Sequence, residues 1–255
     1  MKGLLYITTV IIISVCAPGC HIQAPGDNRP LMVIGVIALI ILLFILLATS
    51  SNLLRDEISN CNEFDENARK IHFKLRSKPG VKKAPYSLTK VQFGVWTVVI
   101  SSSYLYLALL KGDCANVPVN KTAIVLMGIY SALAAATAIL DKREINDNRP
   151  RHQNTPSEGF FNDILSDDNG ISLHRFQNLV WTIIAIVVYL NKLSLITQGC
   201  ILPELSDTLL ALTGISTATY LVMKSKENDP SIQEAAGNNQ TDPSKQTDKD
   251  IIPTQ

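Results

Sequence analysis

Long apolar runs without charge decide what this chain can fold into. Residues 31–54 hold no charged side chain and consist largely of Ile, Leu and Val. Residues 91–110, 122–140 and 176–191 are also free of charge. A helix needs about 20 apolar residues to cross a bilayer core. The pattern predicts an all-α integral membrane protein with these four spans and a fifth, less apolar span at 208–223.

The composition agrees with a membrane protein. Charged residues make up 18% of the chain, below the roughly 25% usual in soluble domains. This excludes a disordered protein, a coiled coil and an ordinary cytosolic enzyme. The chain has 23 Lys and Arg against 22 Asp and Glu. It therefore lacks the excess of positive charge that is typical of a protein that binds nucleic acid. The expected partners are the lipid bilayer and a homo-oligomer or another membrane protein.

The N-terminal segment 1–20 has the features of a signal peptide. Lys2 precedes an apolar run at 4–15, and small residues follow. Three interpretations stay open: a cleaved signal peptide, a retained N-terminal anchor, and a bacterial lipoprotein signal with Cys20 acylated. Five transmembrane helices remain after cleavage, and six if the segment is retained.

The distribution of Lys and Arg predicts the orientation. Nine lie within 52–90 and five within 141–175, but only two within 111–121 and one within 191–207. Basic loops stay in the cytoplasm, so the mature N-terminus is expected outside and the C-terminus inside, in the bacterial inner membrane. Three segments are expected in the cytoplasm: a basic segment at 55–85, a linker at 141–170 and a disordered tail at 224–255.

An internal repeat is the strongest pattern in the chain. Residues 86–97 (YSLTKVQFGVWT) align with 171–182 (ISLHRFQNLVWT), and the only two tryptophans, Trp96 and Trp181, share one repeat position. Each repeat, 86–140 and 171–223, is predicted to be a helical hairpin. Two spans separate equivalent points, so the hairpins form a parallel repeat, a feature also found in transporters.

The repeated motif, Ser-Leu-x-Lys/Arg-x-Gln-x-x-x-Trp-Thr, resembles stretches in uncharacterised bacterial multi-pass inner-membrane proteins. The resemblance covers the two hairpins and leaves the first span and the tail unmatched. It implies a bacterial inner-membrane setting and carries no known activity.

Both repeats place a glutamine near the start of their first helix. An amide facing lipid is costly, so Gln92 and Gln177 are expected to face protein or water. One interpretation is hydrogen bonding between helices. The other is a polar path through the membrane lined by both amides.

The remaining repeated residues predict anchoring and packing. Lys90 and Arg175 are expected at the inner interface, with Trp96 and Trp181 in the aromatic belt. Ser172 is expected to cap its helix. A second set consists of small residues four apart, which let helices pack closely or oligomerise: Gly128, Ala132, Gly214 and Ala218.

The sequence predicts no metal site, no cofactor and no catalytic residue. Its four histidines are scattered, and no enzyme motif is present. Asp167 opens a segment that resembles part of a calcium loop, but its spacing is wrong and it is interpreted as a turn. Cys114 and Cys200 occupy matching outer loops, and two interpretations stay open: a disulfide between them, or two isolated small residues.

Two functions are compatible with these patterns. The first is a non-catalytic scaffold or sensor that acts by assembly through its duplicated hairpins. The second is a small channel or transporter whose path is lined by the repeated glutamines.

Overall fold

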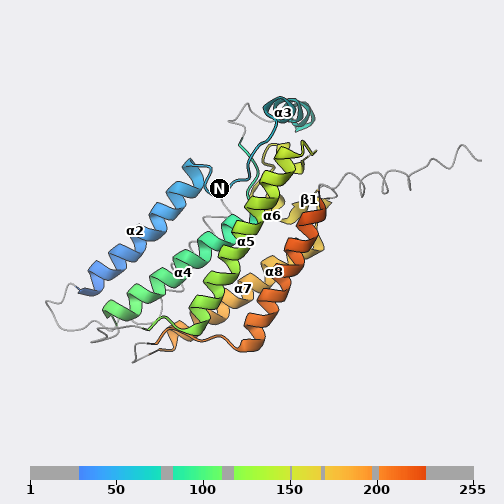
Figure 1. The fold of residues 1–255 in the computed structure, drawn as a ribbon. Coiled ribbons are helices and arrows are strands. Elements are labelled where there is room, and N and C mark those ends of the chain that lie inside the picture. The colour runs from blue at the N-terminus through green and yellow to red at the C-terminus, as the bar shows by residue number, and fades with distance from the viewer. Residues whose placement is uncertain are drawn as a thin grey trace, which may run out of the picture.

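The computed structural model describes residues 29–75, 83–110, 118–149, 151–167, 170–196 and 201–227. These residues fold mainly into helices (Figure 1). In chain order the elements are α2 (Arg29–Ser50), α3 (Cys61–Leu75), α4 (Leu88–Leu110), α5 (Lys121–Asn146), the 3₁₀ helix η1 (His152–Asn154), α6 (Phe160–Leu165), β1 (Ser166–Asp167), β2 (Gly170–Ile171), α7 (Leu173–Ser194) and α8 (Asp207–Glu227). The two strands pair antiparallel.

Five long helices of the described residues lie side by side: α2, α4, α5, α7 and α8 (Figure 1). Helix α4 contacts α2, α5 and α7, whereas α8 packs between α5 and α7. Helix α2 packs mainly on α4, through an apolar contact of Val33, Ile37 and Ile41 with Val98. The bundle therefore consists of four mutually packed helices and one peripheral helix.

The direction of each helix follows from contacts between helix ends. Lys121 and Asp207, the first residues of α5 and α8, form an ion pair at 2.8 Å. Arg175, in the first turn of α7, pairs with Glu227, the last residue of α8. One end of the bundle thus gathers the last turns of α5 and α8 and the first turn of α7. We call it the charged end.

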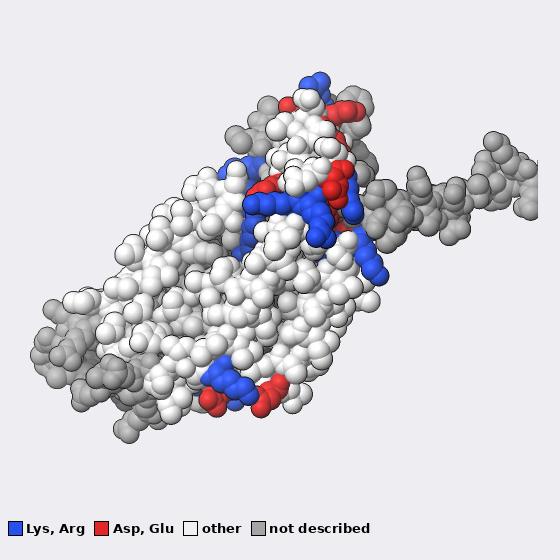
Figure 2. Space-filling view, viewed as in Figure 1, with Lys and Arg blue, Asp and Glu red and all other residues white. Residues whose placement is uncertain are grey.

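The charges are confined to the two ends of the bundle. Figure 2 shows most Lys, Arg, Asp and Glu at the charged end, a small group at the opposite end and an uncharged belt between them. Within the described residues, four helices are long and apolar enough to cross a membrane: α2, α4, α5 and α7. The described residues therefore have the architecture of an all-α membrane protein.

The expected fifth span, 208–223, is not among those four helices. It lies within α8, which has 21 residues and packs against α5 and α7. Threonine, serine and glycine lower its hydropathy, so apolarity alone does not identify it as a span.

The helix bounds differ from several of the predicted segment bounds. Helix α2 ends at Ser50, four residues before the predicted end of the first span at residue 54, and the basic segment 55–85 contains α3. Helix α5 extends to Asn146, into the expected linker, and α8 extends to Glu227, into the expected tail. The N-terminal segment 1–20 and residues 228–255 lie outside the described residues.

Candidate functional site

A polar network crosses the centre of the bundle. The Gln92 amide nitrogen donates to Thr182 Oγ1 at 2.8 Å, and the Asn178 amide nitrogen donates to Gln92 Oε1 at 3.4 Å. Tyr130 Oη contacts the same Thr182 hydroxyl at 2.9 Å, and Thr217 donates to Asn178 at 3.4 Å. Because the five residues come from α4, α5, α7 and α8, the network links all four packed helices.

The second glutamine of the repeat has a different environment. Gln177 is exposed on α7, and its neighbour on the same stripe, Leu173, is 78% exposed. The α7 residue that faces Gln92 is Asn178, which is completely buried. Gln92 therefore faces the protein interior, whereas Gln177 lies on the exposed surface of α7, because α7 presents a different face to the bundle.

Three of the four expected interface anchors are engaged inside the protein. Trp96 is completely buried and stacks on Tyr130 with ring centroids 5.9 Å apart. Arg175 is buried and pairs with Glu227, and Lys90 donates to the Arg55 carbonyl at 2.7 Å. These contacts give the three side chains partners within the protein. Trp181 is half-buried.

The small residues face outward more than expected. Gly128 and Ala132 are exposed on α5, and Ala218 is exposed on α8. A Cβ atom at Gly128 would meet nothing within 4 Å, whereas one at Gly214 would make ordinary contact with Ile129 at 3.7 Å. Close packing inside the bundle is therefore not the role of Gly128, Ala132 or Ala218, and their surface remains open to another helix.

Buried ion pairs organise the charged end. The Arg151 guanidinium binds Asp141 at 2.8 Å and Glu144 at 3.1 Å, and its own side chain is fully buried. The Lys224 amine, also buried, lies 3.3 Å from Asp141. The expected flexible linker is thus packed around Arg151, and Lys224 belongs to the helix bundle and not to a tail.

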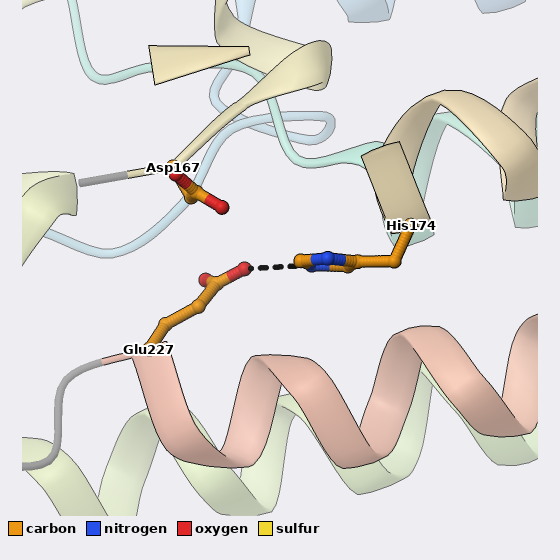
Figure 3. A group of neighbouring side chains, drawn as sticks. All are labelled: Asp167, His174 and Glu227. Carbon is orange, nitrogen blue, oxygen red and sulfur yellow. Dashed lines mark hydrogen bonds and ion pairs between the residues drawn. The ribbon is translucent and has the colours of Figure 1, made fainter. Parts of the chain in front are cut away.

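A second cluster at this end joins three elements. Asp167 on β1, His174 in the first turn of α7 and Glu227 at the end of α8 point toward one another (Figure 3). Their possible metal-ligating atoms all lie within 4.8 Å of one another, and His174 Nε2 is 3.4 Å from Glu227 Oε1. The Ser172 hydroxyl, the expected cap, contacts His174 Nδ1 at 2.8 Å and makes no cap hydrogen bond.

The Glu227 carboxylate is held as an anion. Arg175 donates to both oxygens, at 3.1 Å from Nε and 2.7 Å from Nη2. Burial raises the pKa of Glu227, but the hydrogen bond with His174 and the charges of Arg175 and Lys224 outweigh burial and lower the pKa to about 2. Glu227 is therefore ionised throughout the physiological pH range.

Sequence patterns do not reveal this cluster because its members are far apart in the chain and share no motif. Local sequence indicates a turn at Asp167, an isolated histidine at His174 and a polar tail at Glu227. One available signal is that the helical pattern of α8 continues past the apolar span, through Lys224 and Glu227, without a glycine or proline.

Cys114, Cys200 and Cys20, the candidates for a disulfide and for acylation, lie outside the described residues. The chain matches no protein-family model, no curated protein and no solved structure.

Proposed function

We propose that this chain is a non-catalytic, multi-pass protein of the bacterial inner membrane that acts by assembly, as a scaffold or sensor. The uncharged belt between two charged ends supports the membrane setting. We include α8 as the fifth span, because three of its hydroxyl side chains are buried where it packs on α5 and α7: Thr213, Ser216 and Thr217. The Lys and Arg bias supports a mature N-terminus outside and a cytoplasmic C-terminus.

The observation that carries the assembly proposal is the outward face of α5. Gly128, Ser131, Ala132 and Ala135 are all exposed, with open space around Gly128. Small residues at membrane depth let a second helix approach closely and gain van der Waals contact. This small-residue face is suited to another copy of the chain or to a partner membrane protein.

The channel alternative has less support. It depends on two glutamine amides around one path, but Gln92 is bonded to Asn178 and Thr182 while Gln177 lies on the outer surface. Ion flux through liposomes that carry the purified protein tests it. Flux that is lost in Gln92→Leu would favour a channel over a scaffold.

The assembly proposal is tested with Gly128→Leu, which fills the open space on α5. We expect cross-linking in native membranes to recover an oligomer or a partner complex with the wild type and several-fold less with the variant. Gly35→Leu is the matched control, because Gly35 is also an exposed helical glycine at which an added Cβ atom would meet nothing within 4 Å. A wild-type monomer without partner, or equal loss in both variants, would contradict the proposal.

A further inference from the structure

The Asp167, His174 and Glu227 cluster has the donor set of a metal site. It offers two carboxylates and one imidazole, with their ligating atoms within 4.8 Å of one another. Imidazole together with carboxylate suits first-row transition metals such as Zn²⁺, whereas Mg²⁺ and Ca²⁺ prefer oxygen ligands alone. Three protein ligands leave at least one coordination position for water or another ligand.

The contacts of the cluster are compatible with a bound cation. Arg175 makes one hydrogen bond to each oxygen of Glu227. Each carboxylate oxygen has a second lone pair, so Glu227 can accept a metal while Arg175 orients it. Contacts of this kind around the ligands hold metal-binding side chains in place. Ser172 constrains His174 in the same way, through its contact with the imidazole.

We propose that Asp167, His174 and Glu227 bind one divalent transition-metal cation of the Zn²⁺ class. The cation joins the β1–β2 hairpin, the first turn of α7 and the last residue of α8. Binding therefore ties the end of α8 to the segment between α6 and α7. This inference does not depend on the assembly function.

The experiment is a zinc titration of the full chain, purified in detergent, with bound metal measured after equilibrium dialysis and thermal unfolding followed by circular dichroism. We expect one Zn²⁺ per chain at this site. Because a ligand that binds only the folded state stabilises it, we expect the unfolding temperature to rise by about 5 °C at zinc 100-fold above its Kd. Mg²⁺ and Ca²⁺ at the same concentration should give no rise.

Asp167→Asn and His174→Gln each remove one ligand while leaving the Arg175–Glu227 pair intact. We expect zinc affinity to fall at least tenfold in both, with unchanged helical content in the absence of zinc. Asp147→Asn is the matched control, because Asp147 is an exposed acid near the same end that pairs with Arg149 instead. It should bind zinc as the wild type does.

Three results would overturn the proposal. The first is a wild type that neither binds zinc nor gains stability from it. The second is zinc binding that persists unchanged in Asp167→Asn and His174→Gln, which would place the metal elsewhere. The third is an equal rise in unfolding temperature with Ca²⁺ or Mg²⁺. The wild-type titration decides the first point even if a variant fails to fold.

Discussion

Gln92 is the residue that most directly connects the helices of the bundle. Its amide joins α4 to α7, and through the shared Thr182 hydroxyl it also reaches Tyr130 on α5. Gln177 has the equivalent position in the second repeat but lies on the outer surface of α7. The two glutamines therefore form a matched pair in which one is buried and bonded and the other is exposed.

We expect Gln92→Leu to lower the free energy of unfolding by about 1 kcal/mol, since it leaves Asn178 and Thr182 without their amide partner and membrane hydrogen bonds are worth about 0.6 kcal/mol on average. Gln177→Leu should change it by less than about 0.5 kcal/mol. Unfolding by a denaturing detergent measures both. Equal losses in the two variants would contradict the assignment of Gln92 alone to the core.

At the scale of the elements, α2 is attached to the bundle mainly through its contact with α4. One close contact lies at Gly94, where an added Cβ atom would stand 2.6 Å from Phe44 Cε2 and 2.9 Å from Phe44 Cζ. Because glycine has no Cβ atom, position 94 leaves room for the Phe44 ring between α2 and α4. Gly35, on the same α2 helix, has open space around its Cβ position.

We expect Gly94→Ala to destabilise the packing of α2 on α4 by about 1–3 kcal/mol, because the Phe44 ring must move. Gly35→Ala should be neutral or stabilising, because alanine favours helix and meets no neighbour. A double-mutant cycle with Phe44→Ala, read from unfolding measurements, checks this. Gly94→Ala lowering the free energy of unfolding equally in the wild type and in the Phe44→Ala background would show that the contact with Phe44 is not the cause of the loss.

The segment between α5 and α7 is a second case in which packing governs an element. Asn154 is 1% exposed; its Oδ1 accepts from the Ser59 amide at 3.1 Å, and its amide nitrogen donates to Glu63 at 2.7 Å. These bonds attach η1 to α3 and the residues before it. Prolines and polar residues indicate a flexible linker there, but hydrogen bonds to distant residues give it a defined structure.

At the scale of the whole molecule, an uncharged belt separates the charged end from the end that carries Lys121 and Asp207 (Figure 2). The length of α5, 26 residues or about 39 Å, is sufficient to cross a bilayer core. Asp147, at the C-terminus of α5, and Asp207, at the start of α8, thus lie at opposite ends of the bundle.

We expect a cysteine at position 207 to react with a membrane-impermeant maleimide in intact spheroplasts, and one at position 147 to react only after permeabilisation. The variants Asp207→Cys and Asp147→Cys are made with the five native cysteines replaced by serine. The Lys121–Asp207 pair is exposed, so its loss costs little. The reverse labelling pattern would contradict the predicted orientation in the membrane. Reaction of both cysteines from one side would contradict the placement of positions 147 and 207 on opposite sides of the membrane.

The predicted positions of α4, α5 and α7 were largely correct because length, apolarity and the absence of charge are properties of consecutive residues. The repeated residues do not keep repeated surroundings: Trp96 is completely buried and Trp181 half-buried, and Gln92 is buried whereas Gln177 is exposed. Helix α4 is contacted by α2, α5 and α7, whereas α7 has α8 as its main neighbour. The two copies of the motif therefore bury different faces of their helices.

The sequence by itself determined which segments are apolar enough to enter a membrane and where charge gathers, because both follow from local composition. Only the tertiary structure decided that Asn178 and not Gln177 meets Gln92, that Arg151 orders the linker, and that Asp167, His174 and Glu227 converge. The physical reason is that a side chain's partners depend on the rotation and neighbours of its helix, which residues far away in the chain provide.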